Sequence, residues 1–194
     1  IKDAPDAGIM PPMKGKVEFR DVEFSYEDGV KILDKINFTA SVGETFAIVG
    51  PTGAGKTTIV NLLSRFYNVD SGAVLVDDID ISKVTIHSLR TQMGVMMQDS
   101  FIFSVTIMDN IRYGNMEATD EQVIEAAKAV CAHDFIMAME EGYQTPVNER
   151  GTRLSQGQRQ LISFARALLA DPKILILDEA TSSIDTETEL LLQQ

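Results

Sequence analysis

A glycine-rich segment, GPTGAGKT from Gly50 to Thr57, limits the folds open to this chain more than any other feature of its sequence. It satisfies the pattern G-x-x-x-x-G-K-[ST] and lies between an apolar run, Thr45 to Val49, and a helical apolar pattern that starts at Ile59. Glycines allow such a loop to curl so that successive N–H groups point at one phosphate, and the dipole of the following helix favours the same anion. The segment predicts a phosphate-binding loop between a strand and a helix.

Two side chains of this loop have predicted tasks of their own. Lys56 can reach the β- and γ-phosphates of ATP, and the Thr57 hydroxyl can ligate Mg²⁺. A glycine turn before a surface helix is the structural alternative. We expect the nucleotide contacts of this segment to come from Gly50, Pro51, Thr52, Gly53, Ala54, Gly55, Lys56, Thr57 and Thr58.

Two carboxylates follow the apolar run Ile174 to Leu177, which is predicted to be a short buried strand. Ligands bind at the carboxyl ends of strands in α/β sheets, so Asp178 suits the Mg²⁺ shell. Glu179 is then placed to orient and deprotonate a water that attacks the γ-phosphate. A strand often ends in solvated acids, but beside a phosphate-binding loop the pair predicts ATP hydrolysis.

Strands and helices alternate along the sequence, which is typical of an α/β fold with a largely parallel central sheet. A stretch of helical pattern, from about residue 105 to 170, interrupts this alternation and predicts an inserted helical subdomain. Within it, Thr119 and Gln122 have the spacing of a capping box, and a second helix is expected from about Ser155 to Leu169. The strands are expected at residues 17–26, with a bulge near Asp21, and at 36–42, 45–49, 73–76, 93–97 and 174–177.

Composition excludes several classes of protein. The chain has 17 Lys and Arg against 29 Asp and Glu, and the net charge of −12 argues against a nucleic-acid partner. A single cysteine, Cys131, rules out an internal disulfide.

Residues 1–13 are rich in Pro, Gly and Asp, so we expect residues 1–16 to be a linker from an upstream region. Residues 17–194 are then one domain, C-terminally incomplete because the sequence ends inside a helical pattern.

A polar segment, LSQGQRQ, begins at Leu154 and opens the predicted helix with Ser155 as its N-cap. By itself it is an ordinary helix start. The order of phosphate loop, this segment and ILILDEATSSID, however, resembles the nucleotide-binding domain of ABC transporters, whose signature is LSGGQ. Gln156 replaces the first signature glycine. The resemblance covers nearly the whole chain after residue 16. It implies an α/β P-loop ATPase core with an antiparallel β subdomain and an inserted α-helical subdomain.

The resemblance also implies roles for single residues. Tyr26 would stack on adenine, the alternative being a strand tyrosine in the core, and Gln98 would touch Mg²⁺ or the attacking water. Asp185 would face a partner subunit. Contacts to the nucleotide of the opposing subunit would come from Ser155, Gly157 and Gln158.

The resemblance implies a motor domain that uses ATP and Mg²⁺ as part of a membrane transporter. Two such domains, identical or related, would close head to tail over two Mg-ATP molecules. Residues 65–72, 98–111 and 147–151 resemble the exporter branch with fused membrane domains, in which Glu149 would meet a coupling helix at the cytoplasmic face of the membrane. The family's switch histidine would lie beyond residue 194. An ATP-binding regulatory domain with negligible hydrolysis therefore stays an alternative, as do a soluble ABC ATPase and a small-molecule kinase.

Overall fold

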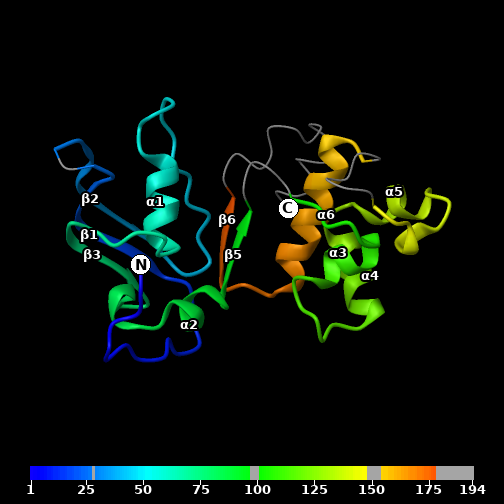
Figure 1. Ribbon diagram of the computed structural model, residues 1–194, viewed down its shortest axis with the longest axis horizontal. Coiled ribbons are helices and arrows are strands. Elements are labelled where there is room, and N and C mark those ends of the chain that lie inside the picture. The colour runs from blue at the N-terminus through cyan, green and yellow to red at the C-terminus, as the bar shows by residue number, and fades with distance from the viewer. Residues whose placement is uncertain (28, 97–100, 148–153, 178–194) are drawn as a thin grey trace. The chain divides into compact units, whose positions relative to one another are not determined.

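The computed structural model describes residues 1–27, 29–96, 101–147 and 154–177. The chain divides into two compact units, Ile1–Met93 and Gly94–Gln194. Figure 1 shows strands beside helix α1 in the first unit and a group of helices in the second. We describe each unit by itself.

The first unit is built on an antiparallel sheet of four strands in the order β2-β1-β3-β4. Alternate side chains of β1 are buried, beginning with Val17 and Phe19, as the sequence pattern predicts for a strand with one core face. This sheet confirms the expected antiparallel β subdomain. The strands are β1 (Val17–Ser25), β2 (Lys31–Ala40), β3 (Ser71–Val76) and β4 (Ile79–Asp80).

The bulge expected near Asp21 is present. Asp21 has a φ of 47°, and the pairing of β1 with β2 shifts register between Phe19 and Val22. On the other side of β1, Gly72 of β3 has a φ of 78°, and a Cβ there would lie 2.3 Å from the carbonyl oxygens of Arg20 and Asp21. Only glycine fits this close approach.

The apolar run 45–49 is not a strand, and the prediction of a buried strand there is wrong. Phe46 is 43% exposed and Val49 88% exposed. A strand buried on both faces needs neighbours at both edges to satisfy its backbone groups, and no strand among the described residues pairs with this run. An apolar run therefore does not establish a strand without its neighbours.

The second predicted buried strand does form, but it is mostly exposed. β6 (Ile174–Leu177) pairs with β5 (Met93–Met96) in a sheet of two strands. Ile176 is buried, whereas Leu175 is 39% exposed and Leu177 44% exposed. Among the described residues β6 has one neighbouring strand, β5, so the expected larger central sheet is not seen there.

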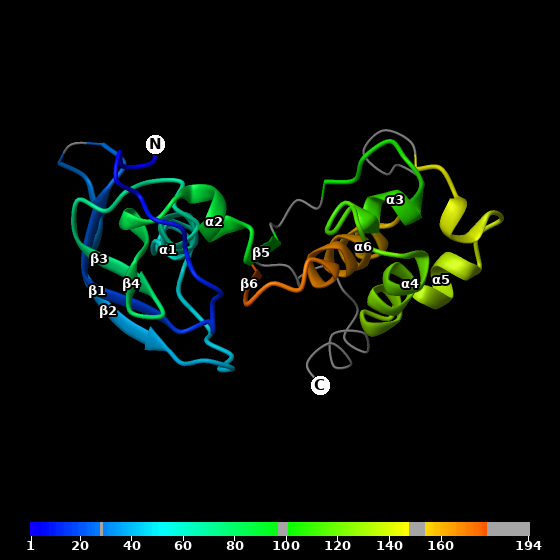
Figure 2. The ribbon, with the colours of Figure 1, turned by 90° about the horizontal axis from the view of Figure 1, so that it is seen from below.

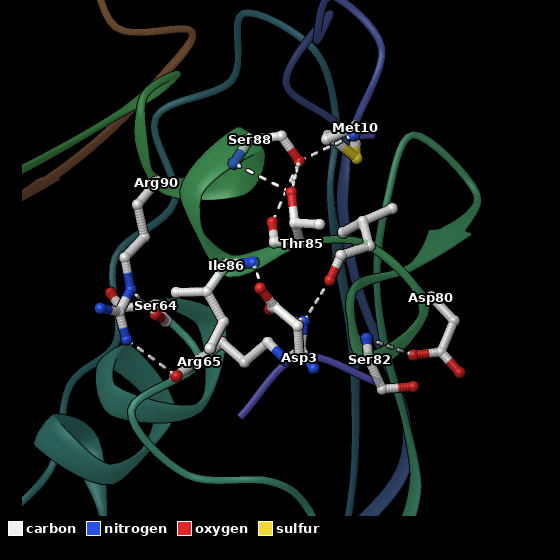
Figure 3. A network of polar contacts seen from close by, with 11 residues as sticks. Asp3, Met10, Ser64, Arg65, Asp80, Ser82, Thr85, Ile86, Ser88 and Arg90 are labelled. Atoms are coloured by element: carbon white, nitrogen blue, oxygen red, sulfur yellow. Dashed lines mark hydrogen bonds and ion pairs between the residues drawn. The ribbon is translucent and has the colours of Figure 1, made fainter. Parts of the chain in front are cut away.

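Helix α1 (Lys56–Leu63) follows the glycine-rich loop and packs with Thr58, Ile59, Leu62 and Leu63 buried. Its carboxyl end is held by Arg90 of α2 (Ile86–Arg90), whose guanidinium donates to the carbonyl oxygens of Ser64 and Arg65 at 2.9 Å each. A cation at this end also opposes the negative end of the helix dipole. Figure 3 shows Arg90 reaching these two carbonyls.

Residues 1–16 pack against the rest of the first unit. Met10 donates its N–H to the Ser88 hydroxyl at 2.9 Å, and Met13 donates its N–H to the Gln92 side chain at 2.8 Å. Asp3 accepts the N–H of Ile86, and its carboxylate lies 3.8 Å from the guanidinium of the buried Arg65 (Figure 3). The expected role of this segment as a linker stays a prediction, but its backbone is fixed on the domain.

The second unit confirms the expected helical subdomain. It contains α3 (Ile107–Arg112), α4 (Asp120–Ala129), α5 (His133–Met137), the 3₁₀ turn η2 (Gly142–Gln144) and α6 (Gln156–Leu169). A second 3₁₀ turn, η1 (Ile81–Lys83), belongs to the first unit. Figure 2 shows α6 lying beside α3 and α4. The capping box at Thr119 is formed as predicted. The core of this unit includes Ile102, Ile107, Ile111, Val123, Ala127, Ile136, Ile162 and Ala165.

A buried polar cluster joins α3 to α6. The Asn110 side chain accepts the Phe103 N–H and donates to the Phe103 and Thr106 carbonyls. Arg166 of α6 donates to the Asn110 carbonyl at 2.7 Å and to its side-chain oxygen at 3.0 Å. Burial lowers the pKa of Arg166, and these bonds compensate the desolvated charge.

The contact at Gly72 predicts a large loss of stability on substitution. Gly72→Ala should lower the free energy of unfolding by about 2–5 kcal/mol, since it adds a backbone clash to a left-handed conformation. Gly43→Ala is the matched control, because Gly43 has a φ of 72° with nothing within 4 Å of the added Cβ. Its cost should be about 1–2 kcal/mol in urea denaturation followed by circular dichroism. Equal losses of unfolding free energy in the two variants would contradict a steric clash at residue 72.

The packing of residues 1–16 predicts a second contrast. Met10 is 3% exposed and its neighbour Ile9 is 82% exposed. Met10→Ala should cost about 2–5 kcal/mol of unfolding free energy, and Ile9→Ala should stay within about 0.5 kcal/mol. The same denaturation experiment tests this, and an unchanged Met10→Ala variant would show that the segment adds nothing to stability.

Candidate nucleotide-binding site

The glycine-rich loop has the curled backbone that its sequence predicts. Gly53 and Gly55 have φ values of 84° and 87°, in the left-handed region, and the Ala54 N–H donates to the Pro51 carbonyl at 3.1 Å. Helix α1 begins at Lys56, directly after Gly55. The expected order of loop and helix is confirmed.

The amino end of α1 has no side-chain cap. Its N-cap residue is Gly55, and its first turn contains no acidic side chain. Four other helices, α2, α3, α4 and α6, are capped by the hydroxyls of Thr85, Thr106, Thr119 and Ser155. Helix α5 also lacks a side-chain cap, but Asp134 lies in its first turn, whereas α1 has no acidic residue there. The positive end of the α1 dipole is therefore left to an acceptor from outside the helix, and a phosphate is the acceptor that such ends bind.

Lys56 lies back over the loop. Its Nζ donates to the carbonyl oxygens of Gly50 at 2.7 Å and Pro51 at 3.1 Å. The ammonium thus stays at the loop, where a phosphate oxygen would form a stronger, charge-assisted hydrogen bond than a neutral carbonyl. The loop and Lys56 fit the phosphates of a nucleotide.

Tyr26, the predicted adenine platform, lies against α1. Its hydroxyl donates to Thr58 Oγ1 at 3.2 Å and accepts from Asn61 Nδ2 at 3.2 Å. Its ring makes T-shaped contacts with Phe24 and Tyr67, with centroids 4.8 and 5.0 Å apart. The side chain is 46% exposed, which differs from a tyrosine of the core and leaves surface for a base.

Sequence reasoning missed Asn61 and Tyr67 as neighbours of Tyr26. A signal for Asn61 was present, because residues 58 and 61 are three apart and share one face of a helix. Tyr67 follows α1, and its place beside β1 depends on the fold, so local sequence gave no sign of it.

In the second unit, Ser155 caps α6. Its Oγ accepts the Gln158 N–H at 3.1 Å, and Gln158 Oε1 accepts the Ser155 N–H at 2.9 Å. A serine hydroxyl that accepts one bond still has its proton to donate, so the cap leaves Ser155 able to bind an anion. Gly157 lies in the first turn of α6, next to this hydroxyl.

Several predicted site residues lie outside the described part of the chain, and their roles stay predictions. They are Gln98, Glu149, Asp178, Glu179 and Asp185. Of the predicted Mg²⁺ ligands, the structure therefore describes Thr57, at the start of α1. Among the described residues no three His, Cys, Asp or Glu side chains form a metal cluster. A magnesium site here would combine the Thr57 hydroxyl with oxygens of the nucleotide and with the predicted ligands Gln98 and Asp178, which lie outside the described residues.

The family of the chain follows from comparison with known proteins. The family model for ABC transporters matches residues 33–182, which include the glycine-rich loop and the start of α6. This chain belongs to the ABC transporter family. The resemblance predicted from the sequence, and with it the P-loop ATPase fold, is confirmed.

Relatives of this ABC transporter domain are larger proteins. It is 54% identical to an uncharacterized ABC transporter ATP-binding protein, YknV, of Bacillus subtilis, over 100% of this chain and 32% of that protein. It is 50% identical to human ATP-binding cassette sub-family B member 6, over 100% of this chain and 23% of that protein. A fatty acid ABC transporter ATP-binding/permease protein of Mycobacterium bovis is 49% identical over 95% of this chain and 29% of its own length.

A solved structure supports the same assignment. The structure of a bacterial Atm1-family ABC exporter with ATP bound superposes with a TM-score of 0.94 and 43% identity, covering 99% of this chain and 34% of that chain. The chain thus spans about a third or less of the length of these relatives. It is an ATP-binding domain of the exporter type. Across the part of the chain that the structure describes, no helix is both long and apolar enough to cross a membrane.

The geometry of the loop predicts the effect of removing its lysine. Lys56→Ala should weaken the binding of a fluorescent ATP analogue by about 10- to 100-fold, the value of a hydrogen bond to a charged group. Lys83→Ala, at the surface of the same unit, is the control and should leave the dissociation constant unchanged. Equal affinities for both variants would mean that the loop does not hold the phosphates.

Proposed function

We propose that the chain is the ATP-hydrolysing motor domain of an ABC exporter. The observation that carries this proposal is the amino end of α1, uncapped by any side chain and preceded by a glycine loop that holds Lys56. Relatives whose names describe ATP-binding and permease functions in one protein support it, as does the likeness to an exporter with ATP bound.

In this proposal the chain promotes hydrolysis by positioning ATP and the attacking water and by offsetting the negative charge of the phosphates. Lys56 and the backbone amides of the loop would hold the β- and γ-phosphates, and the Thr57 hydroxyl and Asp178 would hold Mg²⁺. The bound ion would supply positive charge beside the phosphate oxygens. Glu179 takes a proton from water while the water oxygen bonds to the γ-phosphorus, and the bond from that phosphorus to the β–γ bridging oxygen breaks to release ADP. Tyr26 stacks on the adenine.

The same proposal assigns partners. A second nucleotide-binding domain, identical or related, would face this one head to tail, with Ser155, Gly157 and Gln158 reaching the γ-phosphate bound by the opposing domain. Asp185 would meet that partner. Gln98 and Glu149 would connect the site to the transmembrane region of the transporter, at the cytoplasmic face of the membrane.

A specific observation favours a second candidate, an ATP-binding regulatory domain with negligible hydrolysis. Gln156 occupies the place of the first signature glycine, and it is exposed in the first turn of α6. A side chain there would stand between Ser155 and a nucleotide on an opposing domain. Such a domain would bind ATP and close but release phosphate slowly.

Phosphate release distinguishes the two candidates. We expect steady-state release from Mg-ATP at high protein concentration to fall by at least about 100-fold in Glu179→Gln, the lower range for loss of a general base. Binding of the ATP analogue should persist in this variant, because the loop is intact. ATP binding without turnover in either protein would favour the regulatory domain, and absence of ATP binding by the wild-type chain would overturn both candidates.

A further inference from the structure

We propose that Asn61 is a positioning residue for the base of the bound nucleotide, and that it acts through the hydroxyl of Tyr26. This inference rests on the proposed function, because it assigns the ligand of Tyr26 as the base of ATP. It adds a residue that lies outside the glycine-rich loop and that touches no phosphate group.

The first step is the pair of hydrogen bonds at the Tyr26 hydroxyl. Thr58 Oγ1 accepts the hydroxyl proton at 3.2 Å, and Asn61 Nδ2 donates to the hydroxyl oxygen at 3.2 Å. The two bonds use both functions of one phenol, and they come from side chains one turn apart on α1. A tyrosine at the end of β1 is thereby tied to the phosphate-binding helix.

The second step concerns how the Tyr26 ring is supported and how much of it stays exposed. Tyr26 lies just beyond the last residue of β1, and its ring meets Phe24 and Tyr67 in T-shaped contacts. These contacts support the ring but do not bury it, since 46% of the side chain stays exposed. Without the two bonds at the hydroxyl, the ring is free to leave the orientation in which a base would stack on it.

The third step is the link between base and phosphate. Thr58 belongs to the segment predicted to bind phosphate, and α1 begins at Lys56. Asn61 and Thr58 therefore fix the distance from the Tyr26 ring to the phosphate loop along one rigid helix. A ligand that has both a base and phosphates benefits from this preorganisation, and a ligand that has phosphates alone does not.

The test compares ATP with inorganic tripolyphosphate, each with Mg²⁺, by calorimetric titration. Asn61→Ala and Tyr26→Phe should weaken ATP binding by about 3- to 10-fold, the cost of ordering one released side chain. Both should leave tripolyphosphate binding within about twofold, because the loop is untouched. Asn61 is partly exposed and alanine favours the helix, so the variant should fold, as circular dichroism can verify.

Two controls make the result specific. Asn68→Ala removes an exposed amide next to Tyr67 and should change neither affinity. The double variant Tyr26→Phe, Asn61→Ala should lose no more affinity for ATP than Tyr26→Phe alone, because both changes remove the same bond.

Three outcomes would count against the inference, and they are distinguishable. A wild-type chain that does not bind ATP overturns the proposed function and this inference with it. ATP binding that is unchanged in Asn61→Ala overturns the inference alone. An equal loss of ATP and tripolyphosphate would show that Asn61 supports the fold of α1 and does not position the base.

Discussion

The candidate nucleotide site is arranged around the amino end of helix α1, which no side chain caps. The first turn of an α-helix presents N–H groups with no partner inside the helix, and four of the six α-helices that the structure describes are capped by a threonine or serine. Helix α1 has Gly55 instead, which lets the chain turn sharply but supplies no acceptor. This end can accept a ligand, and the ammonium of Lys56, held at the loop, favours an anion there.

A helix of eight residues is too short to be stable by itself, so α1 depends on its neighbours. Arg90 holds its carboxyl end, and Tyr26 contacts the face that carries Thr58 and Asn61. Its buried side chains pack into the first unit. The amino end of α1 can do without a side-chain cap because the carboxyl end and the buried face of the helix are held by other parts of the first unit.

Features set by a few neighbouring residues were predictable from sequence. The bulge at Asp21, the capping box at Thr119 and the loop at Gly50 are of this kind, since each is determined by local backbone and hydrogen-bond geometry. The strand predicted at 45–49 failed because a buried strand is a property of its neighbours. The packing of residues 1–16 was not predictable from composition. A Pro- and Gly-rich segment is typical of a linker, yet this one contains the buried side chains Met10 and Met13.

The residues of the candidate site also divide into those that local sequence predicts and those that depend on tertiary packing. The curled loop and the Ser155 cap follow from motifs whose geometry is local, and each forms as predicted in its own unit. The contacts of Lys56 and Ser155 with phosphate stay predictions. Of the two neighbours of Tyr26 that sequence analysis missed, one could have been predicted. Helical spacing could have found Asn61, whereas Tyr67 reaches the ring from beyond the end of α1, through packing that no local pattern encodes.

The docking of residues 1–16 has a consequence for the order of events on the ribosome. These residues are made before most of the groups that they bind, which lie 61 to 83 residues later in the chain, between Arg65 and Gln92. At about 5–20 residues per second, the segment waits roughly 3–17 s for the backbone that it binds. During that interval Met10 and Met13 have no core to enter. All of these partners have been made once Gln92 is added, before the helices of the second unit are synthesised.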